Sequence, residues 1–185
     1  MAEKLSEKIY NSIKKDIEDG RLDTREFFSE AQFAEKYNVS KAPVRDALHL
    51  LCSEGYMVSY HRKGYMVNSF SVDEINQIQT IRRAIEHLTI ELVIKNATDE
   101  QIRSLYRYAE ETSGGQDNKA FHMGLAQISG NKYLPDTLEG LLGKIFVAKR
   151  KVVLDTKKHR DILDALLERD EEKAVQCLNA DISLL

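Results

Sequence analysis

The chain has 185 residues, of which 42% are hydrophobic and 31% are charged, a composition typical of a water-soluble globular protein of one or two domains. The formal net charge of −3 excludes a global basic field that would bind nucleic acid without specificity, although local basic clusters remain possible. No apolar run approaches the ~20 residues of a membrane span, and MAEKLSEKIY lacks the apolar core of a signal peptide. We therefore expect a cytoplasmic protein without a membrane partner.

The first part of the chain is predicted to form three helices. Leu5, Ile9, Ile13 and Ile17 recur at helical spacing, which predicts a first helix over residues 5–19. The sequence SEAQ at 29–32 is a capping box that opens a second, short helix. A third helix, capped by Ser40, extends to about Glu54.

The pattern then changes twice. The β-rich stretches YMVSY and GYMVNSF are separated by residues 61–64, which have the composition of a hairpin turn. From Ser71 onward the pattern is helical, with capping boxes at 71–74 and 98–101. Further helices are predicted over 98–112, 117–129, 133–153, 157–168 and 170–183. We therefore expect a mainly α protein, with a winged helix-turn-helix of three helices and a β-hairpin wing over residues 1–70 and an all-α helical bundle over residues 71–185.

The helix over 40–54 is the candidate DNA-reading element, because the second helix of a helix-turn-helix enters the major groove. A hydroxyl and free N–H groups at its start suit a phosphate, and Lys41 and Arg45 share one face from which they can reach guanine edges or phosphates. Cations at the hairpin tip can add phosphate or minor-groove contacts. A protein-docking module with solvated surface cations is the alternative. The candidate DNA contacts are Ser40, Lys41, Ala42, Arg45, Arg62, Lys63 and Gly64.

The stretch SEAQFAEKYNVSKAPVRDALHLLCSEGYMVSYHRKGYMV, residues 29–67, together with the helix before it, resembles the DNA-binding domain of GntR-type bacterial transcription regulators. The resemblance implies a homodimer that binds double-stranded DNA at a short palindromic operator. Two positions depart from the family pattern, since Ala31 and Lys41 stand where arginine is usual. Lysine lacks the bidentate fork of arginine, so we expect a different operator preference.

Polar residues interrupt the apolar faces of the later helices. His122 with Asn118 one turn before it, His159, and Asp181 each lie on a predicted apolar stripe. Two imidazoles, a carboxylate and an amide that converge in a bundle would suit Zn²⁺, Ni²⁺ or Mn²⁺. The alternative for each histidine is a hydrogen-bonded core residue.

Two stretches, NKAFHMGLAQISGN (118–131) and KHRDILDALLERDEEKA (158–174), resemble the FCD effector domain of one branch of the GntR family. In that domain an aspartate and three histidines often bind a metal, which helps to hold a small carboxylate effector. The resemblance places His122 and His159 at two histidine positions, Asn118 at the aspartate position and Asp181 at the last histidine position. It therefore implies either a rearranged metal site or a metal-free hydrogen-bonding pocket, in a shortened domain.

Arg82 and Glu86 match an R-x-x-(L/I)-E pattern of the same family. Arg82, or Arg150 in the later basic stretch, is a candidate for binding the effector carboxylate; the alternative is a helix salt bridge. The sequence therefore predicts a non-enzymatic, homodimeric, ligand-responsive transcription regulator, in particular a repressor. The alternatives are a DNA-binding dimer with a degenerate, ligand-independent carboxy-terminal domain and a metal-dependent hydrolase, which lacks support from any nucleophile–base pair.

Overall fold

The structure is a computed structural model that describes residues 4–109, 115–148 and 157–182. The chain divides into two compact units. One contains Met1–Phe70 with Phe146–Lys151, and the other contains Ser71–Ile145 with Val152–Leu185.

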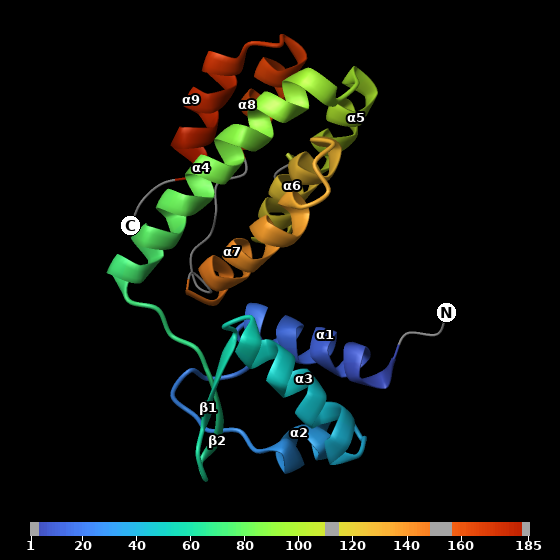
Figure 1. Ribbon diagram of the computed structural model, residues 1–185, viewed down its shortest axis with the longest axis vertical. Coiled ribbons are helices and arrows are strands. Elements are labelled where there is room, and N and C mark those ends of the chain that lie inside the picture. The colour runs from blue at the N-terminus through green and yellow to red at the C-terminus, as the bar shows by residue number, and fades with distance from the viewer. Residues whose placement is uncertain (1–3, 110–114, 149–156, 183–185) are drawn as a thin grey trace. The chain divides into compact units, whose positions relative to one another are not determined.

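The amino-terminal unit consists of three helices followed by a hairpin (Figure 1). Its elements are α1 (Leu5–Glu18), α2 (Glu30–Lys36), α3 (Lys41–Ser53), β1 (Met57–Tyr60) and β2 (Gly64–Val67). The predicted capping box is present, because the Ser29 hydroxyl accepts from the backbone N–H of Gln32 and the Gln32 side chain accepts from that of Ser29. Asn38 adopts a positive φ of 53°, which turns the chain sharply between α2 and α3.

The wing contains a short extra strand pairing beyond its hairpin. Strands β1 and β2 are antiparallel with Met57 opposite Val67. Phe28, just before α2, also pairs with Tyr65, and the two backbones exchange N–H to O=C hydrogen bonds of 2.7 and 2.8 Å. Gly64 makes this approach possible: its φ is +104°, and a Cβ atom there would lie 2.5 Å from the Phe28 carbonyl oxygen. The wing is thus attached to the segment that leads into α2.

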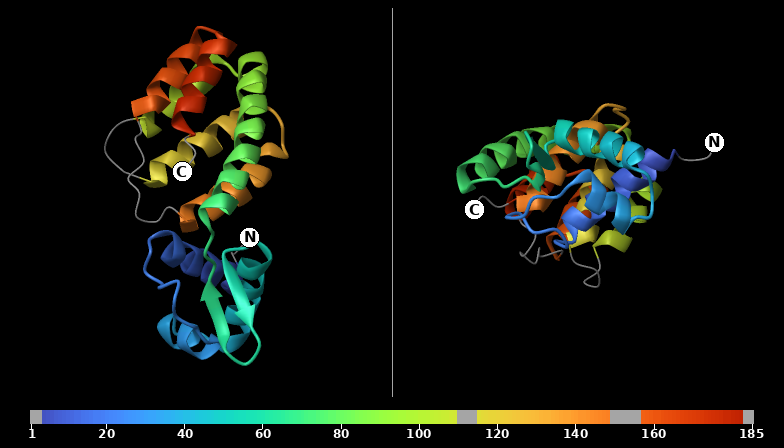
Figure 2. Two further views of the ribbon diagram at one scale, coloured as in Figure 1. Left: turned by 90° about the vertical axis from the view of Figure 1, so that its left-hand side faces the viewer. Right: turned by 90° about the horizontal axis from the view of Figure 1, so that it is seen from below.

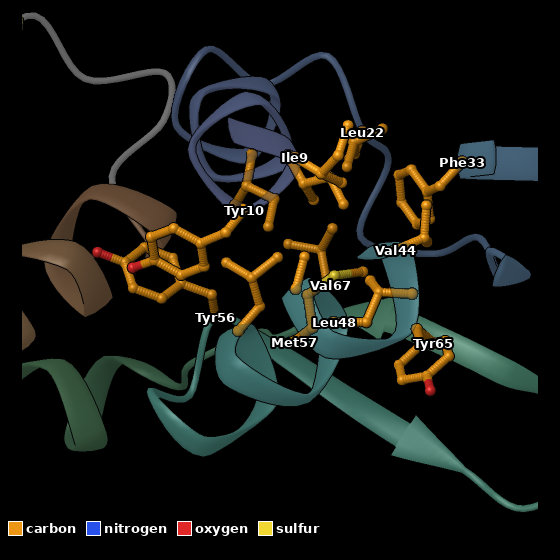
Figure 3. Close-up of a cluster of buried hydrophobic side chains, with 14 of the residues drawn as sticks. Ile9, Tyr10, Leu22, Phe33, Val44, Leu48, Tyr56, Met57, Tyr65 and Val67 are labelled. Atoms are coloured by element: carbon orange, nitrogen blue, oxygen red, sulfur yellow. The ribbon is translucent and has the colours of Figure 1, made fainter. Parts of the chain in front are cut away.

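The core of this unit lies between α1, α3 and the hairpin (Figure 3). Ile9, Ile13 and Ile17 of the predicted α1 stripe are buried, whereas Leu5, the first residue of the helix, is 52% exposed. The side chains of α3 and the wing that close the core are fully buried, and they are Val44, Leu48, Leu51, Tyr56, Met57 and Val67. Burial of such side chains removes apolar surface from water, which stabilises the arrangement of α3 relative to the wing.

All regular secondary structure in the described residues of the second unit is helical (Figures 1 and 2). Its elements are α4 (Val72–Asn96), α5 (Asp99–Arg103), the 3₁₀ helix η1 (Ser104–Tyr108), α6 (Gly115–Ile128), α7 (Leu134–Ala148) as far as Ile145, α8 (Lys157–Leu167) and α9 (Glu171–Asp181). The capping boxes that open α4 and α5 are both present. Helices α8 and α9 pack together, and α4 packs against both α6 and α9.

The predicted fold class, a mainly α chain with a winged helix-turn-helix and a helical bundle, is confirmed. One predicted helix differs. The helix expected over 98–112 is the short α5 followed by η1, with residues 110–112 outside the described ranges. The helix expected over 133–153 is α7 as far as Ala148, and residues 149–153 lie outside the described ranges. In the described ranges, no helix is long and apolar enough to cross a membrane.

Candidate functional site

A cluster of polar side chains lies inside the second unit, contributed by four helices. His122 and Asn118 come from α6, His159 from α8, Asp181 from the end of α9 and Glu86 from α4. Both imidazoles are completely buried, and the Asp181 side chain is only 5% exposed. The polar residues that the sequence analysis located on the apolar faces of different helices therefore lie together in one cluster.

The two imidazoles direct one nitrogen each toward the same carboxylate. His122 Nε2 lies 3.1 Å from Asp181 Oδ2, and His159 Nε2 lies 3.5 Å from Asp181 Oδ1. The opposite nitrogen of His122, Nδ1, donates to Glu86 Oε2 at 2.5 Å, while His159 Nδ1 lies 3.4 Å from the Tyr108 carbonyl oxygen. Outer partners of this kind fix the orientation and tautomer of metal-ligating histidines.

The donor atoms of His122, His159 and Asp181 fit a divalent cation. These atoms all lie within 4.8 Å of one another. His122 Nε2 is buried, and although Asp181 Oδ2 lies 3.1 Å away, the geometry is not that of a hydrogen bond, and no other described residue supplies one. Its lone pair is therefore left for a ligand once Nδ1 carries the proton. Nitrogen and carboxylate ligands in this combination suit Zn²⁺, Ni²⁺ or Mn²⁺.

Asn118 occupies the edge of the same cluster. Its Nδ2 lies 3.1 Å from His159 Nε2, so the amide donates to the imidazole while His159 Nδ1 points toward the Tyr108 carbonyl. The structure thus brings together all of the predicted metal-site residues, with Asn118 in contact with a ligand nitrogen. An amide can turn either its oxygen or its nitrogen toward such a site.

Arg82 lies beside this cluster on α4 and is buried. Its Nε donates to Glu86 Oε1 at 2.5 Å, and its Nη1 is 3.4 Å from Gln79 Oε1. Its Nη2 is buried without a hydrogen-bond partner among the described residues. The helix salt bridge offered as an alternative therefore exists, and a charged donor remains unsatisfied beside it. Arg150, the other candidate for the effector carboxylate, lies outside the described residues.

Glu86 has a role that the sequence did not indicate, because it links Arg82 to His122. Burial alone would raise the pKa of Glu86, but Arg82 and His122 hold it below its usual value. Burial also opposes the charged form of His122, yet Glu86 and Asp181 raise its pKa. Burial, with the nearby His122, lowers the pKa of His159 to about 4, so this imidazole is neutral near pH 7.

The candidate DNA contacts lie at two places in the amino-terminal unit. Ser40 is the N-cap of α3 and makes no side-chain capping bond, and Lys41 and Ala42 are exposed in the first turn of the helix. Arg62 occupies the wing turn with a φ of +60°, and Lys63 Nζ lies 5.7 Å from the centre of the Phe27 ring. Gly64, which the sequence offered as a candidate DNA contact, permits the close approach of the Phe28 backbone.

Comparisons with known families cover both units. Residues 5–67 match the bacterial regulatory proteins of the gntR family, and residues 77–184 match the FCD domain. The chain belongs to the GntR family and carries an FCD domain. It is a DNA-binding transcription regulator, and the hydrolase alternative is rejected because the family and the relatives are regulators.

Among the relatives of this GntR regulator, YdhC, an HTH-type transcriptional regulator of Bacillus subtilis (strain 168), is 29% identical, with 90% of this chain and 83% of that protein covered. The HTH-type transcriptional repressor RspR of Escherichia coli (strain K12) is 25% identical, with 90% and 80% covered. The solved structure of E. coli McbR/YncC has a TM-score of 0.83 at 20% identity, with 98% of this chain and 94% of that chain covered, and it shares the fold.

Proposed function

We propose that this GntR regulator represses transcription as a homodimer on a short palindromic operator and is released from the operator by a small carboxylate effector. Residues 1–70 would read DNA, and residues 71–185 would bind the effector and form the dimer. The observation that carries the proposal is Nη2 of buried Arg82, which has no hydrogen-bond partner in the described part of the chain and lies beside the His122–His159–Asp181 cluster. A buried charged donor without a partner is costly, and an anion would satisfy it.

The repressor role is supported by the names of relatives. RspR and GlaR of E. coli (strain K12), which are 25% and 24% identical to this chain, are both named transcriptional repressors. For the operator, Lys41 and Arg45 near the start of α3 would contact bases or phosphates in the major groove. Arg62 and Lys63 at the wing tip would contact phosphates or the minor groove.

The homodimer is supported by the exposed side of α4. Ile81 and Leu88 are 54% and 43% exposed, and Ala84 is exposed between them. This spacing gives one apolar stripe along a helix, of the kind that packs against another helix. A second copy of the chain would cover the stripe, and its two-fold symmetry would match that of a palindromic operator.

The cofactor would be one divalent cation, Zn²⁺, Ni²⁺ or Mn²⁺, held by His122, His159 and Asp181 with Asn118 at its edge. Bound there, the cation would supply a Lewis-acidic contact for an effector carboxylate. Glu86 orients His122, and Arg82 offers its Nη2 to the same anion. The effector would shift the population of dimers toward a placement of the two DNA readers that mismatches the operator half-sites.

A regulator with a degenerate sensor is the second candidate, and Asn118 is the observation that favours it. Its amide already satisfies His159 Nε2 without a metal, and a neutral amide is a weaker ligand than a carboxylate.

The deciding experiment measures binding of the full-length protein to its selected operator by fluorescence anisotropy. Zn²⁺, Ni²⁺ or Mn²⁺ is added singly, or a chelator replaces them, and lactate, succinate and citrate serve as probes. We expect at least one probe to weaken operator binding by about tenfold, the range typical of allosteric coupling. Arg82→Met should remove this response and keep operator affinity, whereas the exposed Arg103→Met should keep both. Indifference to every probe and metal would support the degenerate sensor.

A separate pair of substitutions tests the DNA face. Lys41→Ala with Arg45→Ala should abolish preference for the operator over a scrambled duplex of equal length, because both base-reading side chains are removed. Retention of that preference would refute the assignment of α3 as the reading helix.

A further inference from the structure

Glu30 holds the guanidinium of Arg45 by two hydrogen bonds. Arg45 Nε donates to Glu30 Oε1 at 2.9 Å, and Arg45 Nη2 donates to Glu30 Oε2 at 2.8 Å. This bidentate pair joins the first residue of α2 to the proposed DNA-reading side of α3. Because both donors lie along one edge of a planar group, the pair fixes the direction of the guanidinium as well as its position.

The carboxylate of Glu30 is itself well anchored. Ser29 and Gln32 form the capping box that fixes the backbone at the start of α2. The Tyr65 hydroxyl, from strand β2, donates to Glu30 Oε1 at 3.5 Å. Glu30, on α2, therefore contacts both α3 and the wing. It connects all of the elements that would touch DNA.

The remaining donors of Arg45 point away from this pair. A guanidinium has five N–H groups, and Glu30 accepts from one on Nε and one on Nη2. The other three N–H groups, both on Nη1 and the second on Nη2, have no partner among the described residues, and the side chain is 53% exposed. One N–H of Nη1 and the free N–H of Nη2 lie side by side and form a second fork of the shape that pairs with guanine O6 and N7.

A carboxylate at this place also has an unfavourable effect. Negative charge beside a phosphate-binding surface weakens binding to any DNA, since that binding depends on the net neutralisation of phosphates. Hydrogen bonding from Arg45 lowers the pKa of Glu30, so the carboxylate is ionised near pH 7. Glu30 thus opposes electrostatic attraction to DNA on the surface that would use it.

We propose that Glu30 is a positioning residue for specificity: it orients the free fork of Arg45 toward the major groove and weakens binding to DNA that offers no base partner. The inference rests on the proposed role of Arg45 as a DNA contact. Both effects increase specificity, because one strengthens binding to the operator and the other weakens binding to competing DNA. Removal of Glu30 should therefore change operator binding and nonspecific binding in opposite directions.

The test compares variants of the full-length protein on the operator and on a scrambled duplex, over a series of salt concentrations. Glu30→Gln keeps the shape of the side chain and removes its charge. We expect about a tenfold loss of operator affinity, as for one lost bidentate contact, with a gain of about twofold or more on the scrambled duplex. The released Arg45 can then neutralise a phosphate, so the salt slope on the scrambled duplex should steepen by up to about 1.

Glu35→Gln is the matched control, because Glu35 is exposed on the same helix and carries the same charge. It should preserve the ratio of operator to scrambled affinity within about twofold. Glu30→Asp is the second variant, since it keeps the charge but shortens the reach to Arg45. It should lose operator affinity without gaining affinity for the scrambled duplex, and thermal unfolding would verify that each variant is folded.

Several outcomes would overturn the inference. Equal losses on both duplexes in Glu30→Gln would mean that Glu30 only supports the fold, and an unchanged operator affinity would mean that it orients nothing. If Glu35→Gln had the same effect on both duplexes, the result would follow from the net charge of the protein and not from the position of Glu30. In the Arg45→Ala background, Glu30→Gln should cause no further loss of operator affinity. An additional loss in the double variant would contradict action through Arg45. Full operator affinity in Arg45→Ala alone would instead refute the proposed function of that arginine.

Discussion

The carboxylate of Glu86 lies 2.5 Å from His122 Nδ1, and this contact joins α4 to α6 at the centre of the buried cluster. The other oxygen of the same carboxylate accepts from Arg82 Nε. The Glu86 carboxylate therefore neutralises the charge of buried Arg82 and orients the imidazole of His122. The carboxylate–histidine pair has the form of an outer contact at a metal site, and the pair with Arg82 ties it to the candidate effector donor.

Glu86→Gln should lower the free energy of unfolding by about 3 kcal/mol, because it leaves the buried charge of Arg82 without its counter-charge. Urea unfolding would measure the change. The exposed Glu91→Gln on the same helix should cost less than about 0.5 kcal/mol. Replacement of both partners, Arg82→Met with Glu86→Leu, should recover most of the loss. Equal effects of the Glu86 and Glu91 changes would contradict the structural role of the pair.

Zn²⁺ at about 100 times its dissociation constant should stabilise the protein by about 2.7 kcal/mol if it binds only the folded state. The shift in melting temperature on addition of the metal should disappear in His159→Ala and Asp181→Asn, which remove proposed ligands. The exposed Asp161→Asn on α8 is the matched control and should keep the shift. An unchanged shift in His159→Ala would place the metal elsewhere.

Asp16→Asn should destabilise the amino-terminal unit near pH 7 by about 2 kcal/mol, because Arg21, Lys36 and Tyr37 all donate to this buried carboxylate. Burial opposes the charge, but those partners lower the pKa of Asp16 from its usual 3.8. Between the two values the unfolded chain binds more protons, so this stability is present above about pH 4 and is lost as the pH falls further.

The measurement for Asp16 is urea unfolding at pH 7 and at pH 3. The difference between wild type and Asp16→Asn should shrink at the lower pH, since pH 3 lies below the usual pKa of 3.8 and protonation there favours the unfolded chain over the folded carboxylate with its lowered pKa. The exposed Asp46→Asn should show little difference at either pH. A cost for Asp16→Asn that stays the same at pH 3 would mean that charge contributes nothing to the role of this residue.

Gly64→Ala should destabilise the protein by about 2 kcal/mol and weaken operator binding, because the added Cβ would lie 2.5 Å from the Phe28 carbonyl oxygen at a φ of +104°. Gly20→Ala is the control that separates the backbone strain of a positive φ from the collision of the new Cβ with a neighbouring atom. Gly20 has a φ of +71°, but a Cβ there meets no atom within 4 Å, so only the strain of about 1 kcal/mol remains. Chemical unfolding and anisotropy would record both effects, and equal costs for the two changes would disprove the collision with Phe28.

Ile81→Glu with Leu88→Glu should convert the proposed dimer into a monomer, because charges would replace the exposed apolar stripe of α4. Light scattering after gel filtration would report the mass. Tyr133→Glu, which changes an apolar residue 69% exposed elsewhere in the unit, should leave the mass unchanged. A dimer that survives the double change would locate the interface on another surface.

Local patterns predicted the features that depend on neighbouring residues. The predicted capping boxes at Ser29, Ser71 and Thr98 all formed. These features follow from hydrogen bonds within one turn of chain, which explains why spacing alone identifies them. The polar residues on apolar stripes also indicated the cluster around His122 and His159.

Contacts between distant residues were not predictable in the same way. Glu86 and His122 are 36 positions apart, and nothing in the spacing of either helix reveals that they meet. The pair of Glu30 with Arg45 and the pairing of Phe28 with Tyr65 depend likewise on tertiary packing. The 3₁₀ turn at Ser104–Tyr108 broke a pattern that had predicted one continuous helix, because packing against α6 and α8 overrides local propensity there.

The pairing of Phe28 with Tyr65 has a mechanical consequence for the regulator. Phe28 is followed directly by Ser29, the cap of α2, so the wing and α2 are attached at adjacent residues, and Glu30 extends the attachment to α3. Because these contacts connect the wing to both helices, we expect the DNA-binding unit to move as one body, with little freedom for the wing to bend away from the helices. An effector signal would then alter where each reader sits on the operator and leave its internal shape intact.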